Sequence, residues 1–230
     1  MILTPLFLFH LIPLIVSTIS LSSISSSSSL SMSPLKLFLQ RSRAVATTLT
    51  NASSQRIAVV IGNEAADADS IVSALTYAYL KQQQKDQRQT STSPSTVIPL
   101  CSVPKKDIKL RRDVEILFQA AGLDIDELIC IDECSGLSSS VLEELILVDH
   151  NKLSQDLSHL CPYVTEIVDH HKDMGEYTSV DGEKRNIAFE NEEATVGSAC
   201  TLIFENYVNF TSSSSKCLLD DTISTLLMGV

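Results

Sequence analysis

This chain is short of basic residues. Its 17 Lys and Arg stand against 28 Asp and Glu, which gives a formal net charge of −11. Nucleic-acid surfaces neutralise phosphates with a basic face, so we expect no nucleic-acid partner. Phosphate chemistry is not excluded, because divalent cations held by carboxylates can lie between an acidic pocket and an anionic substrate.

The six cysteines also include no Cys-x₂-Cys pair, a spacing that would indicate a zinc site. Several of them lie within apolar runs, and we expect them to pack in the core. No internal repeat is visible. The length of 230 residues is enough for one sizeable domain, or for one domain with a tail.

The amino end contains no Lys, Arg, Asp or Glu over residues 1–35. Its apolar opening, Met1–Leu21, is near the ~20 residues of a signal core or membrane anchor, but no basic segment precedes it. Lys36–Ser54 is rich in Arg, Ser and Thr and has no acidic residue, as in an organellar transit peptide. We therefore expect residues 1–55 to be a targeting or disordered segment outside the fold. A membrane is expected as a partner only if Met1–Leu21 is an uncleaved anchor.

Beyond this segment, apolar runs alternate with amphipathic stretches. Continuous apolar runs predict buried strands over residues 57–61, 145–148 and 164–168. Further strands are predicted over 97–103, 128–131 and 186–189, and helices over 69–84, 110–121, 195–208 and 217–228. The alternation predicts an α/β fold with a mostly parallel sheet flanked by helices.

Each of the three buried runs ends in acidic or imidazole side chains. The motifs that follow the runs are Asn63 to Asp69, Asp149-His150-Asn151 and Asp169-His170-His171. Open α/β folds place their sites at the carboxyl edge of the sheet, so we expect these groups to converge there. Because crowded carboxylates repel one another unless cations neutralise them, the pattern predicts a site for hard divalent metals.

Taken singly, each motif also has a simpler interpretation. Asp69 before Ser70 is typical of a helix N-cap, and the polar triplet after the second run is typical of a turn. For His170-His171, the simpler interpretation is a pair of exposed histidines in a loop. Adjacent histidines cannot face the same way from an extended backbone. We therefore expect one to bind metal and the other to donate a proton or a hydrogen bond to a phosphate oxygen. Asp169 would then orient a neighbouring imidazole.

Together, Gly62–Ala74 and Asp169-His170-His171 resemble the motifs of the DHH phosphoesterase superfamily. The opening Gly62-Asn63-Glu64, in place of the Gly-His of family II inorganic pyrophosphatases, resembles the exopolyphosphatase and Prune branch. Three more segments are similar to that branch: Leu110–Glu115, Val148–Asn151 and Val196–Leu202. The resemblance covers Arg56–Val230 and implies a DHH domain over residues 56–230.

The resemblance implies two divalent cations, Mg²⁺ or Mn²⁺, with Co²⁺ as a further candidate. Asp67 would bind the first ion and Asp69 the second. Asp149 would bridge both ions, and His170 would bind the second. Asn63 stands where the pyrophosphatases have a histidine ligand, and an amide oxygen there would favour hard ions.

The implied reaction is hydrolysis of phosphoanhydride bonds in polyphosphate or pyrophosphate, by a metal-activated water that attacks phosphorus in line. His171 would be the catalytic residue, contacting phosphate and assisting the leaving group. The family resemblance implies a cytoplasmic location; the alternative is the secretory pathway or an organelle, reached through the N-terminal segment.

The sequence departs from the family pattern at its end. It stops at Leu227-Met228-Gly229-Val230, before the Asp of a fourth motif that completes the second metal site. We expect the DHH domain to be incomplete at its C-terminus and a C-terminal domain of the DHHA2 type to be missing. One alternative is therefore a truncated, non-catalytic family member that acts as a binding partner or fragment. A further alternative is a nucleotide or oligonucleotide phosphodiesterase, which the Gly62-Asn63-Glu64 opening and the acidic composition disfavour.

Overall fold

The computed structural model describes residues 32–50, 55–88, 96–134, 136–180, 182–214 and 216–230. The expected anchor at Met1–Leu21 lies outside these residues. The strands are β1 (Ile57–Ile61), β2 (Thr96–Leu100), β3 (Leu142–Val148), β4 (Val164–Asp169), β5 (Arg185–Ile187), β6 (Phe189–Glu190) and β7 (Glu193–Ala194). The α-helices are α1 (Pro34–Thr48), α2 (Ala68–Gln87), α3 (Lys105–Ile108), α4 (Arg112–Ala120), α5 (Ala199–Ser213) and α6 (Asp221–Met228). Short 3₁₀ helices are η1 (Ile125–Glu127), η2 (Ile131–Glu133), η3 (Gln155–Tyr163) and η4 (Gly182–Lys184).

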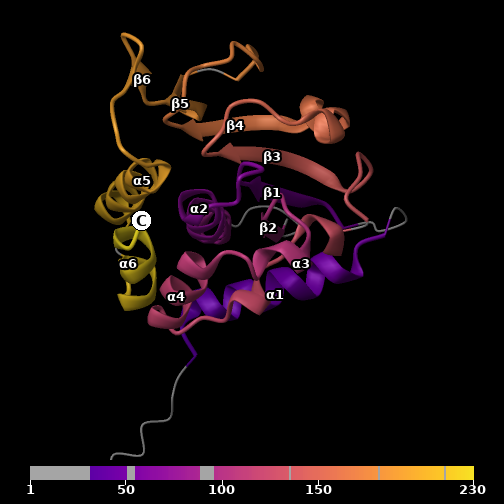
Figure 1. The fold of residues 1–230 in the computed structure, drawn as a ribbon, viewed down its shortest axis with the longest axis vertical. Helices are drawn as coiled ribbons and strands as arrows, with labels where there is room; N and C mark the ends of the chain where they lie inside the picture. The colour runs from indigo at the N-terminus through magenta and orange to yellow at the C-terminus, as the bar shows by residue number, and fades with distance from the viewer. Residues whose placement is uncertain (1–31, 51–54, 89–95, 135, 181, 215) are drawn as a thin grey trace, which may run out of the picture. The chain divides into compact units, whose positions relative to one another are not determined.

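Five strands form one parallel sheet in the order β2-β1-β3-β4-β5, which confirms the predicted α/β fold (Figure 1). The three strands predicted from continuous apolar runs, β1, β3 and β4, lie in the interior of the sheet. Pro99 cannot donate to a strand ladder, and it lies in the edge strand β2. The strand predicted over 128–131 is wrong: only Cys130 forms a bridge there, with Cys101, before η2 begins.

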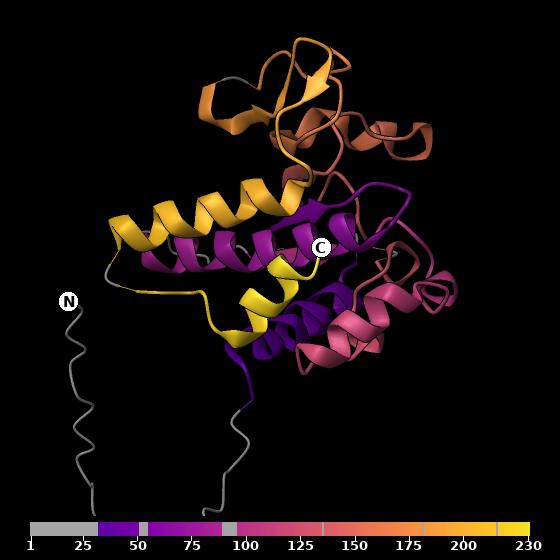
Figure 2. The same cartoon turned by 60° about the vertical axis from the view of Figure 1, so that its left-hand side comes forward.

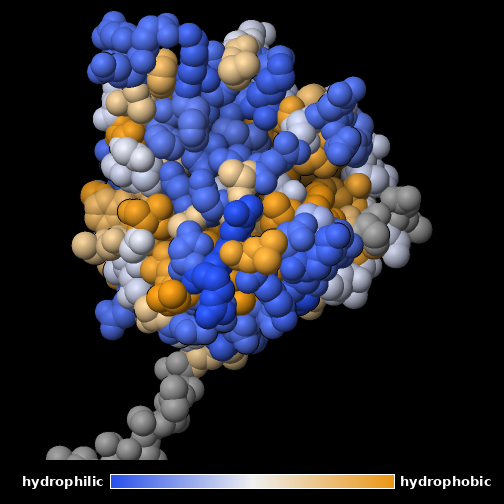
Figure 3. Space-filling view, in the orientation of Figure 1, coloured by the Kyte–Doolittle hydropathy of each residue, from blue (hydrophilic) through white to orange (hydrophobic). Residues whose placement is uncertain are grey.

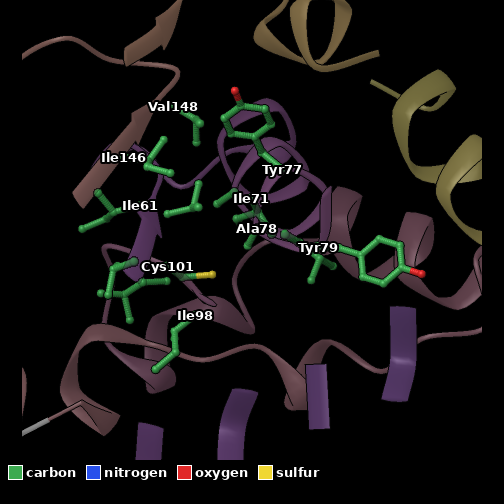
Figure 4. Close-up of a cluster of buried hydrophobic side chains, with 14 of the residues drawn as sticks. Ile61, Ile71, Tyr77, Ala78, Tyr79, Ile98, Cys101, Ile146 and Val148 are labelled. Atoms are coloured by element: carbon green, nitrogen blue, oxygen red, sulfur yellow. The ribbon is translucent and has the colours of Figure 1, made fainter. Parts of the chain in front are cut away.

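Two long helices pack against this sheet. α2 contacts β1 and β2, while α5 contacts β4 and runs alongside α2 (Figure 2). The core between α2 and the sheet is built from Ile71 and Tyr77 of the helix and Ile61, Ile146 and Val148 of the strands (Figure 4). α5 begins four residues later than predicted, because Ser198 has extended backbone angles and caps the helix.

The cysteines lie mostly where the apolar runs predicted. Cys101, Cys130, Cys134 and Cys200 are buried and free of disulfide bonds. Cys161 is partly buried and Cys217 is exposed. The expectation of core packing is therefore confirmed for four of the six cysteines.

The helix α1 corrects the expectation that all of residues 1–55 lie outside the fold. Leu35 and Leu39 on its inner face are fully buried, and the Phe38 ring lies 5.5 Å from the ring of Tyr79 on α2. The Ser42 hydroxyl donates to the Val97 carbonyl of β2 at 3.0 Å. The absence of acidic residues suggested a transit peptide, but the apolar face of this segment covers the edge strand, and Met32–Val230 forms one compact unit. No helix among the described ranges is both long and apolar enough to cross a bilayer.

A pair of leucine truncations tests whether α1 is part of the fold. We expect Leu39→Ala to lower the free energy of unfolding by about 2–5 kcal/mol, because it removes a buried side chain. The matched control Leu37→Ala, at a position with 36 % exposure on the same helix, should cost less than about 1 kcal/mol. Urea unfolding measures both changes, and equal small losses would contradict the packing of α1.

Candidate functional site

The register of the sheet brings the three motifs to one level. Ile61 of β1 pairs with Leu147 of β3, and Leu147 pairs with Ile167 of β4. Two residues beyond this row, the three chains reach Asn63, Asp149 and Asp169. The strand ends therefore deliver one polar residue each to the same edge, as parallel pairing requires.

The loop between β1 and α2 is held by contacts on several sides. Gly62 allows the first turn of α2 to come close, since a Cβ at this position would lie 2.8 Å from the Ser70 carbonyl oxygen. The Ser102 hydroxyl donates to the Gly62 carbonyl, and the Arg111 guanidinium donates to the Ala65 carbonyl. These contacts fix the course of the chain that carries the first motif.

Asp149 lies at the centre of the site. It is 2 % exposed and has a positive φ of 62°, a conformation that Asp tolerates better than most residues. Its Oδ2 accepts a hydrogen bond of 2.7 Å from the Asn63 amide. Its Oδ1 is buried without a hydrogen-bond partner. A buried carboxylate oxygen left without a donor is costly, so this atom is suited to a cation.

His170 faces this unpartnered oxygen. Its Nε2 lies 3.3 Å from Asp149 Oδ1 and 3.4 Å from Asp69 Oδ2. The imidazole therefore lies between two carboxylates, one in the loop after β3 and one in the first turn of α2. A neutral imidazole nitrogen beside two carboxylate oxygens is a donor set that divalent metals accept.

His171 has a different environment from its neighbour. Its Nδ1 lies 2.8 Å from Asp169 Oδ1, and its side chain is 55 % exposed. Single ligand atoms of Asp149, His170 and His171 lie within 4.8 Å of one another, and the two imidazole centroids are 4.3 Å apart. The two histidines are thus both near Asp149 but hold different partners.

The two aspartates of the first motif have different hydrogen-bond partners. Asp67 caps α2, because its Oδ1 accepts from the Ser70 amide at 3.0 Å, so the interpretation of Asp69 as the N-cap is wrong. The helix begins at Ala68, which leaves Asp69 in its first turn. There the Asp69 carboxylate accepts from the amides of Ala199 (2.9 Å) and Cys200 (3.0 Å) at the start of α5.

Asn63 is oriented differently from the ligand that we expected. Its Oδ1 accepts hydrogen bonds from the backbone amides of Ala65 and Ala66. Its Nδ2 donates to the side chain and the backbone carbonyl of Asp149. Because two amides fix the position of the oxygen, the nitrogen, which cannot coordinate a cation, faces the site. An amide-oxygen ligand at Asn63 would require this side chain to turn over.

The crowded acidic groups perturb Asp149. Burial, followed by the charges of Asp69, Asp67 and Asp169, raises the pKa of the Asp149 carboxyl to about 8. An ordinary Asp with a pKa near 4 is ionised at neutral pH, whereas this carboxyl holds a proton in the absence of cations. The raised pKa of this carboxyl and its buried Oδ1 without a hydrogen-bond partner both fit a bound divalent metal.

A cavity of about 590 Å³ adjoins these groups. Asn63, Asp149 and His171 line one part of it, and Leu153 and Met174 line another. In Figure 3 the surface between β4 and α2 is mostly hydrophilic, while apolar surface lies over α5 and α6. The site is therefore open to a polar substrate.

Sequence reasoning missed the contact between α2 and α5. Ser198 Oγ donates to Asp69 Oδ1 at 2.8 Å, in addition to the two backbone amides of α5. The signal that could have found it is the capping serine itself, because Ser198 precedes an apolar helical run. What the sequence did not indicate is that the partner of this helix start is a candidate metal ligand.

Comparisons with known proteins agree with these motifs. A family model described as the DHH family, N-terminal domain, matches residues 57–230. A Schizosaccharomyces pombe protein, provisionally named an exopolyphosphatase, is 34% identical over 160 residues, which are 69% of this chain and 37% of that protein. Exopolyphosphatase PRUNE1 of Homo sapiens is 33% identical over 119 residues, or 51% of this chain and 25% of its own length. The chain thus spans about a third or less of these curated relatives.

The raised pKa predicts proton release when a cation binds. A divalent ion takes the carboxylate form of Asp149, so binding of Mn²⁺ near pH 7 should release about one proton, and progressively less above pH 8. Calorimetry in buffers with different ionisation enthalpies measures this number. Asp149→Asn should remove the released proton, and an equal release from that variant would contradict the assignment.

The same group predicts how stability without cations depends on pH. Its folded pKa of about 8 exceeds the ordinary value of 3.8, so it stabilises the fold fully below pH 3.8. This contribution is lost as the pH rises through about 8. Urea unfolding in the presence of a chelator should therefore show a decline over this range that Asp149→Asn lacks. A decline of equal size in the variant would assign it to other groups.

Proposed function

The chain belongs to the DHH family, and we propose that it hydrolyses phosphoanhydride bonds with the help of two divalent cations. The substrates would be inorganic polyphosphate or pyrophosphate. The observation that carries this proposal is Oδ1 of Asp149, a buried oxygen without a hydrogen-bond partner that lies 3.3 Å from His170 Nε2. The names of the relatives support the same class of reaction.

We carry the cation ligands over from the family resemblance, and the closeness of Asp69, Asp149 and His170 supports them. Asp149 would bridge two ions, with Asp67 on the first and Asp69 and His170 on the second. We assign Asn63 to hold Asp149 through its amide nitrogen rather than to bind an ion itself. Mg²⁺ or Mn²⁺ bound here would lower the pKa of a bridging water and neutralise charge on the phosphoryl oxygens.

His171 is suited to work on the phosphate side of the site. Its Nδ1 is engaged by Asp169, so Nε2 is the nitrogen left to contact a phosphate oxygen. The buried Asp169 carboxylate holds the Nδ1 side of the ring, so a proton on Nε2 can pass to the departing oxygen. Because His171 is the more exposed of the two histidines, a substrate in the cavity can reach it.

A second candidate function is hydrolysis of a nucleotide phosphoester. The observation that favours it is the apolar part of the cavity wall, formed by Leu153, Leu157 and Met174. An organic group attached to the phosphate would bury apolar surface there. Inorganic polyphosphate has no such group, so the choice of substrate separates the two candidates.

Release of phosphate from polyphosphate and pyrophosphate in the presence of Mg²⁺ or Mn²⁺ tests the proposal. A cyclic dinucleotide releases no phosphate when a phosphodiester is cut, so chromatography of the linear product measures its turnover. We expect turnover of the inorganic substrates and a loss of at least about 100-fold in Asp149→Asn, because both ions lose a ligand. Asp113→Asn removes an equal charge from the exposed start of α4 and should keep its rate within about twofold.

Three outcomes would change the assignment. Near-normal turnover by Asp149→Asn would refute the bridging role. Turnover of the dinucleotide alone would favour the second candidate. Binding of Mn²⁺ without turnover of any substrate would favour a non-catalytic family member.

A further inference from the structure

Asn151 is a buried side chain to which the proposed reaction assigns no part. It lies in the loop after β3, two residues beyond Asp149, and is 3 % exposed. Its Nδ2 donates to Asp169 Oδ2 at 2.6 Å and to the Lys172 carbonyl at 3.0 Å. Its Oδ1 accepts from the Met174 amide at 2.8 Å. Both N–H groups and the oxygen of this amide therefore bond to Asp169, the last residue of β4, or to the loop that follows it.

The two oxygens of the Asp169 carboxylate have different hydrogen-bond partners. Oδ2 accepts from Asn151, while Oδ1 accepts from the backbone amides of His170 (2.8 Å) and His171 (3.1 Å) and lies 2.8 Å from His171 Nδ1. A carboxylate can rotate about χ2, since this torsion is broad. The two backbone amides hold Oδ1, and the Asn151 amide holds Oδ2, so that together they fix the plane of the carboxylate with Oδ1 toward His171.

We propose that Asn151 is a positioning residue for His171. By fixing the plane of the Asp169 carboxylate, it keeps Nδ1 of His171 engaged and presents Nε2 to the phosphate. This inference rests on the proposed function for its effect on rate, but the arrangement of the imidazole is a separate property. Histidines are commonly oriented by a carboxylate, and here Asn151 in turn orients that carboxylate.

The chemistry of an amide explains why Asn is suited to this position. At the length of its side chain, only an amide donates two hydrogen bonds and accepts one. Asp has the same shape but would place an oxygen 2.6 Å from the carboxylate of Asp169, and Leu has a similar volume without donors. A residue that merely filled this space would tolerate the second change.

The kinetic test compares Asn151→Asp and Asn151→Leu with wild type under the conditions of the phosphate-release assay. We expect kcat to fall about 10- to 100-fold while KM stays within about threefold, because substrate still binds but the imidazole is misplaced. The control Asn206→Asp removes an amide that donates to a carbonyl on α5, and its kcat should stay within about twofold.

Exchanging the two side chains sharpens this test. In the double variant N151D/D169N, the amide at position 169 donates to the carboxylate at position 151, and its carbonyl oxygen still accepts from His171. We expect this variant to recover at least about fivefold of the kcat lost in N151D. If N151D does not fold, Asn151→Leu decides: a folded variant with a lowered kcat and an unchanged KM supports the inference, and a folded variant with the kcat of wild type overturns it.

A spectroscopic measurement separates this inference from the proposed function. In the wild-type protein with Mg²⁺, nitrogen NMR of His171 should show a proton on Nδ1 whether or not Nε2 carries the second, transferable proton. In Asn151→Leu it should show a mixture of the two neutral tautomers. If the wild type has no turnover but the tautomer changes, the proposed function fails and the positioning role stands. If turnover and the His171 signals are the same in wild type and both single variants, the positioning role is overturned.

Discussion

The burial of Asp149 between other acidic groups is the constraint on which the site depends. Its carboxyl is almost inaccessible to water and lies near the negative charges of Asp67, Asp69 and Asp169, with the His170 imidazole in front of Oδ1. A fold tolerates such an arrangement when the group holds a proton or when a cation occupies the space in front of it. The raised pKa describes the first state, and the unpartnered Oδ1 indicates the second.

The fold maintains this crowding by making each acidic group part of another structure. The Asp67 carboxylate caps the start of α2, and the Asp69 carboxylate accepts hydrogen bonds from the first two amides of α5. The Asp169 carboxylate accepts from the backbone amides of both histidines. Since every one of these carboxylates also accepts hydrogen bonds that order the backbone, none can swing away from its neighbours without loss. The helix starts add partial positive charge where the carboxylates cluster. The same contacts therefore stabilise the local structure and hold the site together.

The sequence predicts the sheet better than the details at its edge. Strands such as β1 and β4 are continuous apolar runs, and their parallel pairing follows from the alternation with helices, so the convergence of the motifs could be foreseen. The orientation of Asn63 could not, because it depends on which backbone amides meet the side-chain oxygen once the loop has closed. The helix α1 was missed for a different reason. Its composition resembles that of a transit peptide, and only contact with β2 and α2 reveals that its apolar face is buried.

Asn151 shows how the two middle loops form one unit. The loop after β3 carries Asp149, and the loop after β4 carries both histidines, so each alone supplies only part of the candidate metal site. A single amide joins them by bonding to a side chain and to two backbone groups of the second loop. Parallel pairing of β3 with β4 brings the loops to the same level, but it leaves their side chains free to rotate. The interaction between Asn151 and Asp169 restricts that freedom beside His171, the imidazole for which we propose a contact with phosphate, and such a contact depends on accurate placement.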